Sequence, residues 1–166
     1  MRRLKKQIES YEPLFNKAIQ ILSRGNRSIA ATQDKLSEYC LNADLIQKVI
    51  LRLRELNYLN DERYAESLVE SKVRYGKSRL RNILLQKKIP KDIADMACDG
   101  LEERDVDTIR HIAEKKWDSL SKKGDREKNK DKLFRFLVSR GFSFELAMKQ
   151  VKLLSNDLSR QNDFEE

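Results

Sequence analysis

The chain has 166 residues, of which 39% are hydrophobic and 37% charged, and its net charge is +8. So much charge leaves little apolar surface for one large core, and the basic excess favours an anionic partner such as nucleic acid, an acidic protein surface or anionic lipid. Neither a run of about 20 apolar residues nor a secretory leader is visible, and two separate cysteines exclude a disulfide scaffold. We therefore expect a cytoplasmic protein.

Apolar residues recur every three or four positions almost throughout, which predicts an all-α fold. The first clear helical face runs from Leu45 to Leu53. Asn42 is placed to cap this helix, and Asp44 lies in its first turn, where the helix dipole favours negative charge. Asn57 follows as the expected end of the helix.

A second group of helices is predicted from about Asp61. Its first helix is expected to bury Tyr64, Ala65, Leu68, Val69 and Val73. Gly76 follows the last turn, where a left-handed residue is favourable. A short helix over 78–88 turns Leu80, Ile83 and Leu84 inward. After Pro90 a third helix carries Ile93, Ala94, Met96, Ala97 and Leu101.

The same plan recurs, because "KLSEYCLNADLIQKVI" aligns with "LLQKKIPKDIADMAC" and with "FLVSRGFSFELAMKQV". The offsets of about 48 and about 53 residues are typical of tandem helical units. In the last copy Ser143 is placed as a helix cap, with Phe142 before it as an apolar staple.

We predict three tandem three-helix modules that stack into an elongated, curved molecule. The predicted segments are an N-terminal extension at 1–12, modules at 13–57, 58–103 and 104–154, and an acidic, frayed tail at 155–166. One irregular helical bundle remains the alternative.

No constellation for catalysis is visible in the sequence. His111, the only histidine, lies among apolar helix positions, where a structural role is favoured over that of a base or metal ligand. Nucleotide-binding glycine loops, the zinc-protease motif and the nucleophile elbow are all missing from the sequence. We predict no enzyme activity, no cofactor and no metal.

Positive charge concentrates in "KVRYGKSRLRNILLQKKIPK", which contains no acidic residue. Its basic residues are Lys72, Arg74, Lys77, Arg79, Arg81, Lys87, Lys88 and Lys91. Long cations on a helical scaffold suit phosphate groups, and the backbone N–H groups near Ser78 offer a further anion site. Tyr75 either stacks on a base or seals the helix end.

A second basic cluster, interrupted by acidic residues, lies in the last module. It comprises Lys122, Lys123, Arg126, Lys128, Lys130, Lys132, Arg135 and Arg140. From this cluster Arg135 and Arg140 join the candidate binding residues.

The stretch "LNYLNDERYAESLVESKVRYGKSRLRNILLQKKI" strongly resembles the central motif of the RecX family, bacterial modulators of the RecA recombinase. The matching motif residues include Leu59, Asp61, Arg63, Tyr64, Ala65 and Gly76. Arg140, Gly141 and Phe142 match the family's arginine-glycine-phenylalanine signature. Apart from Arg140, we expect these motif residues to be mainly structural, with Asp61 and Arg63 capping and pairing at a module junction.

The resemblance implies a curved monomer of three-helix repeats that regulates RecA without catalysis. It would lie in the groove of the RecA filament on single-stranded DNA and inhibit filament extension, ATP hydrolysis and strand exchange. The implied partners are RecA and single-stranded DNA, with duplex DNA as a further candidate and no membrane. Two alternatives stay open: an independent helical nucleic-acid-binding protein such as a transcription factor, and a scaffold for an acidic protein surface.

Overall fold

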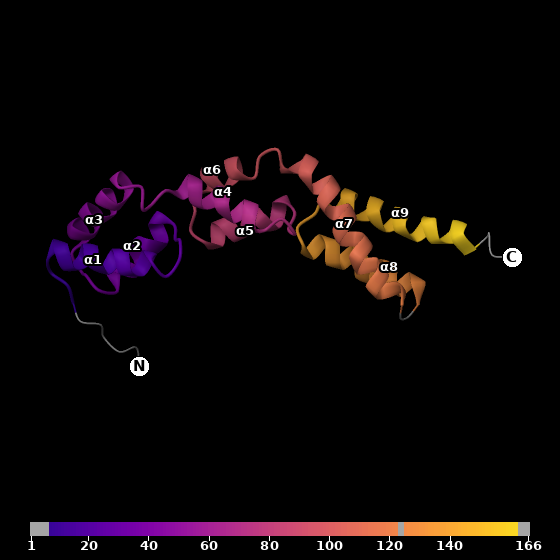
Figure 1. The fold of residues 1–166 in the computed structure, drawn as a ribbon, viewed down its shortest axis with the longest axis horizontal. Helices are drawn as coiled ribbons and strands as arrows, with labels where there is room; N and C mark the ends of the chain where they lie inside the picture. The colour runs from indigo at the N-terminus through magenta and orange to yellow at the C-terminus, as the bar shows by residue number, and fades with distance from the viewer. Residues whose placement is uncertain (1–6, 123–124, 163–166) are drawn as a thin grey trace. The chain divides into compact units, whose positions relative to one another are not determined.

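The computed structural model describes residues 7–122 and 125–162, with side chains described as far as residue 156. Within these ranges the regular elements are all helices (Figure 1), so the predicted all-α fold is confirmed. The helices are α1 (Tyr11–Leu22), α2 (Ile29–Ser37), α3 (Ala43–Glu55), α4 (Asp61–Ser71), α5 (Lys77–Gln86), α6 (Lys91–Ala97), α7 (Leu101–Ser121), α8 (Arg126–Ser139) and α9 (Phe144–Asn162). They form three successive groups of three, as tandem three-helix repeats do.

Two compact units divide the chain. The first contains Met1–Leu68 and Leu84–Ala97, and the second contains Val69–Ile83 and Cys98–Glu166. Helices α4 and α5 therefore contribute to both units. Each unit also includes one junction between successive modules: α1–α3 with α4 and α6 in the first, and α5 with α7–α9 in the second.

The core of the first unit is built from amphipathic helices with local caps. In α3, Ile46, Val49, Ile50 and Leu53 are buried, as the periodicity predicted. The Asn42 side-chain oxygen accepts a hydrogen bond from the Leu45 N–H at 3.0 Å, which confirms the predicted cap. Asn57 is left-handed (φ 58°) just after the helix, so it ends α3 as expected.

The core of the second unit lies among α7, α8 and α9. Its buried residues are Ile109, Ala113, Trp117, Leu133, Leu137, Phe142, Ala147 and Val151. Trp117, the only tryptophan of the chain, is 4% exposed. Ser143 caps α9 by accepting a hydrogen bond from the Leu146 N–H at 3.2 Å, as predicted.

Several details of the sequence-based prediction were wrong. Met96 and Val73 are exposed, at 74% and 55%, because short α6 buries only one face and Val73 lies in the turn beyond the end of α4. Leu101 begins α7, since left-handed Gly100 (φ 68°) separates it from α6. His111 lies on the exposed side of α7 and outside the core.

The C-terminal helix extends further than the sequence indicated. α9 continues to Asn162, so residues 155–162 of the expected frayed tail are helical, and residues 163–166 lie outside the described part of the chain. Ser155 is buried one turn beyond buried Val151, which continues the packed face past the predicted module end. Among the helices of the described residues, none is both long and apolar enough to cross a bilayer.

Candidate nucleic-acid interface

The start of α5 packs directly against the loop between α8 and α9. The Gly76 N–H donates to the Arg140 carbonyl at 2.9 Å, and the Ser78 N–H donates to the Gly141 carbonyl at 3.3 Å. A Cβ on Gly76 would lie 2.6 Å from the Gly141 carbonyl oxygen, and one on Gly141 would collide with the backbone of Arg79. Both glycines are therefore required for this close backbone approach.

The prediction that Gly76 is a left-handed helix end was wrong. Its φ lies outside the left-handed range, whereas Gly141 has φ 90°. Position 76 requires glycine because the backbone of another module lies against it. This contact joins residues that are far apart in the sequence.

Asp105, at the start of α7, completes the cap of α5. It is 3% exposed, and its Oδ2 accepts a hydrogen bond from the Lys77 N–H at 2.9 Å. Burial raises the pKa of Asp105, and the Lys77 hydrogen bond and the Arg104 charge act against that rise. The N–H groups of Gly76, Lys77 and Ser78 are thus all occupied, so the expectation that they bind an anion was wrong.

The first unit contains an equivalent junction at the start of α2. Asp61, which is 6% exposed, accepts a hydrogen bond from the Ile29 N–H at 2.9 Å. Burial raises the pKa of Asp61, while this bond and the Arg54 charge lower it. Asp61 therefore caps a helix of the preceding module, and Asn60 caps α4 itself by accepting from the Arg63 N–H at 3.0 Å.

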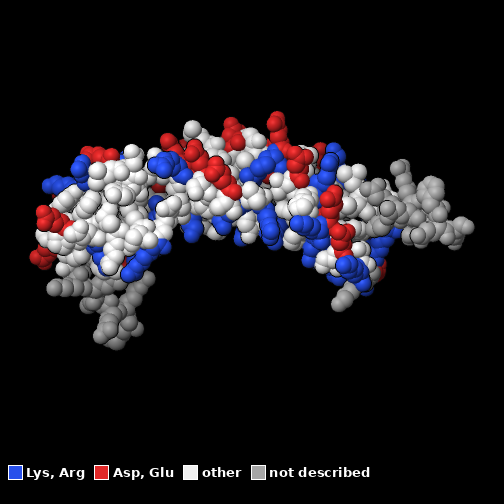
Figure 2. Space-filling view, viewed as in Figure 1, with Lys and Arg blue, Asp and Glu red and all other residues white. Residues whose placement is uncertain are grey.

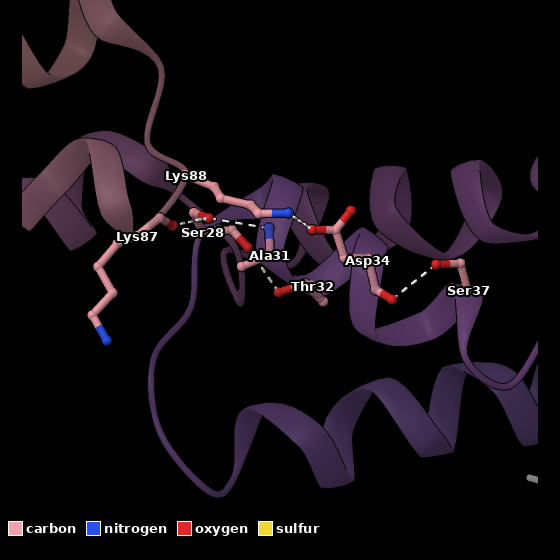
Figure 3. Close-up of polar contacts among 7 residues, drawn as sticks. All are labelled: Ser28, Ala31, Thr32, Asp34, Ser37, Lys87 and Lys88. Carbon is pink, nitrogen blue, oxygen red and sulfur yellow. Dashed lines mark hydrogen bonds and ion pairs between the residues drawn. The ribbon is translucent and has the colours of Figure 1, made fainter. Parts of the chain in front are cut away.

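The loop after α5 completes this junction (Figure 3). The Ser28 hydroxyl donates to the Lys87 carbonyl at 2.6 Å and accepts from the Ala31 N–H at 3.1 Å. Lys88 is left-handed (φ 60°), and its ammonium group forms an ion pair with Asp34. Figure 3 shows the Lys87 side chain pointing away from α2, so its charge stays available to a partner.

The predicted basic residues fall into three groups by environment. Five are exposed and have no ion pair with a described residue: Arg74, Arg79, Lys87, Lys91 and Arg135. Lys72 and Arg81 are half-buried. Lys77 and Lys88 form ion pairs with Glu102 and Asp34, and Arg140 lies over aromatic rings.

The units divide these residues as well. Lys87, Lys88 and Lys91 belong to the first unit, and the other candidates belong to the second. Lys and Arg side chains project from the surface over α5 in Figure 2. In the weaker second cluster, Lys130 is paired with Glu127 at 2.6 Å, and Lys123 lies outside the described residues.

Comparison with known proteins assigns the family. Two family models match, the second three-helix domain of RecX at residues 60–97 and the third at residues 102–150. Regulatory protein RecX of Clostridium perfringens (strain 13) is 33% identical over 145 residues, which cover 86% of this chain and 68% of that protein. The chain belongs to the RecX family. Regulatory protein RecX of Chlorobaculum tepidum is 32% identical, with 88% of this chain and 91% of that protein covered.

A solved RecX structure has the same fold. The crystal structure of RecX from Lactobacillus salivarius aligns with a TM-score of 0.76 at 26% identity, covering 87% of this chain and 96% of that one. The names of these relatives describe regulatory proteins, in agreement with the family resemblance of the central motif. In this chain, motif residues Gly76 and Gly141 meet at one junction, and Asp61 caps a helix at the other.

Sequence reasoning missed two residues of the second unit. The Arg140 guanidinium lies 5.2 Å from the Tyr75 ring centre and 5.0 Å from that of Phe136. Lys116 lies 5.3 Å from the Phe136 ring centre. These contacts hold two cations beside partly exposed rings and are consistent with Tyr75 sealing the helix end. The usable signal was that Lys116 and Phe136 each adjoin a core position, Trp117 and Leu137.

Proposed function

We propose that this RecX-family protein regulates the RecA recombinase by binding the filament that RecA forms on single-stranded DNA. It lies in the filament groove and blocks extension, which lowers ATP hydrolysis and strand exchange. The observation that carries the proposal is that five of the candidate basic side chains (Arg74, Arg79, Lys87, Lys91 and Arg135) are exposed and have no ion pair with a described residue, in a chain of this family.

Among these cations, Arg79 suits a phosphate-rich partner because its helix, α5, has a buried face. Leu80 and Leu84 of α5 are each 1% exposed, so the helix between them is anchored by its buried face. Arg79, on the same helix, is exposed to solvent. A cation on a fixed helix loses less conformational freedom when it contacts a phosphate.

A regulator of this kind needs no reactive group. Occupying the groove is enough to oppose the addition of further RecA subunits, so the protein acts as a monomer in the cytoplasm, without cofactor or metal. The regulatory names of its relatives support this mode of action.

The deciding experiment measures RecA ATPase on single-stranded DNA with increasing amounts of this protein. We expect activity to fall as the protein approaches stoichiometry with RecA, and imaging to show added density in the groove. Unchanged ATPase activity at stoichiometric protein would contradict the proposal. Sequence-specific binding to duplex DNA without RecA would favour the transcription-factor alternative.

Charge variants test the surface itself. We expect Arg79→Glu with Lys87→Glu to weaken filament binding by at least about tenfold, because exposed cations provide the salt-dependent affinity for phosphates. The control Lys5→Glu with Lys6→Glu should change it less. With wild type, log affinity should fall by about 0.7 per contacted phosphate for each unit of log salt, whereas a flat response would indicate protein-only contacts.

A further inference from the structure

An acidic and apolar cleft lies between α4 and α6 in the first unit. Glu62 and Glu66 of α4 line one side, and Ile93, Met96 and Ala97 of α6 line the other, around a volume of about 220 Å³. Met96 is 74% exposed, and Ile93 and Ala97 are half-buried. The cleft therefore presents carboxylates beside an uncovered apolar surface.

Its charge is opposite to that of the chain as a whole. Although the net charge is +8, α4 and α6 together carry six acidic and two basic residues. Acidic side chains gather on the surface over these helices in Figure 2. Among the described residues, no basic side chain lines the cleft, and neither Glu62 nor Glu66 has an ion pair with a described residue.

The internal structure accounts for only one of these two glutamates: Glu62 lies in the first turn of α4, where the helix dipole favours negative charge, and Glu66 lies beyond that turn. They lie four residues apart on one helix, a spacing at which like charges weaken the helix. Both are exposed, so they fill no part of the core. A pair of like charges that has no ion pair with a described residue is available to a cationic partner outside the chain.

The surface extends beyond this first cleft. A larger cleft of about 540 Å³ shares Glu62 and Ile93 with it and reaches Ile29 and Pro90. Arg54 is the basic residue among those that line this second cleft. Together the two clefts form a groove, which we call the α4–α6 groove, that offers apolar contacts along α6 and acidic ones along α4.

We propose that the α4–α6 groove receives a basic amphipathic helix from a partner protein. Such a helix covers Met96 and Ile93 with its apolar face and places Lys or Arg beside Glu62 and Glu66, as in other helix-in-groove complexes. The flexible thioether of Met96 adapts to different apolar side chains. Nucleic acid is disfavoured here because its phosphates repel both carboxylates. This proposal is independent of the proposed function, since it involves neither RecA nor DNA.

The test uses the full chain and three synthetic peptides of about 18 residues, or about five helical turns. The first peptide is an amphipathic Leu/Lys helix, the second replaces its leucines with serine, and the third replaces its lysines with glutamate. Isothermal titration calorimetry should show the first binding at least about tenfold more tightly than either other peptide. Equal binding of the serine peptide, or tighter binding of the glutamate peptide, would overturn the proposal.

Matched variants locate the binding. We expect Glu62→Gln with Glu66→Gln, and separately Met96→Ser, to weaken binding of the Leu/Lys peptide by at least about fivefold. The control pair Glu103→Gln with Asp107→Asn removes two exposed carboxylates at the same spacing on α7 and should change it less than about twofold. Leu41→Ser, at an 85% exposed site, controls for Met96→Ser.

Three outcomes contradict the assignment. One is an equal loss in the control variants, and another is unchanged binding in the groove variants. The third is self-association of the wild type that Glu62→Gln with Glu66→Gln abolishes, since it would assign the groove to a second copy of the chain. Because the substituted side chains are exposed, we expect no variant to melt below the wild-type temperature.

Discussion

The junctions in the first and second units use the same polar contact with different backbone distances. In each, a buried aspartate accepts a hydrogen bond from the N–H that opens the second helix of the preceding module: Asp61 from Ile29, and Asp105 from Lys77. The residue before that N–H differs. Ser28 reaches the neighbouring loop with its hydroxyl, whereas Gly76 uses its own backbone N–H.

This difference explains why only one loop needs glycine for space. In the second unit the two backbones touch, so the left-handed position is Gly141. In the first unit the Ser28 side chain lies between helix and loop, and the left-handed position holds Lys88. A left-handed lysine lowers the free energy of unfolding by about 1–2 kcal/mol. It also provides this junction with a cation, which glycine at the equivalent position 141 does not.

The largest effect on stability should come from a side chain placed in the close contact between Gly141 and Arg79. We expect Gly141→Ala to lower the free energy of unfolding by about 3 kcal/mol or more, because the new methyl collides with Arg79 and the left-handed backbone disfavours alanine. Gly100→Ala is the matched control, since Gly100 is also left-handed but has nothing within 4 Å of an added Cβ. Urea unfolding should show a loss of about 1 kcal/mol for the control. Equal losses would mean that crowding plays no part.

The two carboxylate caps should behave alike. Asp61→Ala or Asp105→Ala leaves a buried N–H without its acceptor, so each should lower stability by about 1–3 kcal/mol. The asparagine variants keep an acceptor and should stay within about 1 kcal/mol of wild type. Thermal melting checks both pairs. For Asp61→Ala, we expect the melting temperature to fall before filament affinity changes; lost binding with unchanged melting would instead mean direct contact with the partner.

The caps also predict a pH dependence. Burial raises the pKa of both aspartates above the ordinary value of 3.8, so the native state keeps protons that the unfolded chain has already released. The contribution of these bound protons to the free energy of unfolding is full below pH 3.8 and is lost as the pH rises through the raised pKa values. Relative to the Asp61→Asn, Asp105→Asn double variant, wild type should therefore lose stability over that window. Urea midpoints measured across it test the prediction, and a constant difference would contradict it.

The smallest effect should come from Lys88. Lys88→Gly relieves the left-handed backbone and gives up only an exposed ion pair, so we expect a gain of about 0.5–1 kcal/mol. Lys87→Gly, at a neighbouring position outside the left-handed region, should lower stability instead. Thermal melting of the two variants checks the opposite signs. A loss in both would show that the side chain of Lys88 matters more than its backbone.

Features encoded by neighbouring residues could be predicted from the sequence. Periodicity located the buried face of α3, and short-range spacing identified Asn42 and Ser143 as caps. Features that depend on distant residues were missed or misread. Gly76 was assigned a turn role because its contact with Gly141, which comes from another module, is not visible in the sequence.

The candidate interface shows the same limit. The basic residues were visible in the sequence, but their ion pairs were not, because Glu102 and Asp34 belong to other modules. Those pairs remove Lys77 and Lys88 from the set of unpaired cations that Arg79 and Lys87 represent. Composition predicts the sign of the charge on a surface, whereas the fold determines which charged side chains remain free of ion pairs and so available to a partner.

The position of Trp117 has a practical consequence. As the single indole, buried among α7–α9, it makes tryptophan emission, excited at a wavelength where tyrosine does not absorb, a reporter of the second unit alone, whereas far-ultraviolet circular dichroism sums over every helix. A substitution that loosens the first unit should therefore displace the dichroism transition and leave the emission transition where it was. Two optical probes of one unmodified sample can in this way separate the unfolding of the two units.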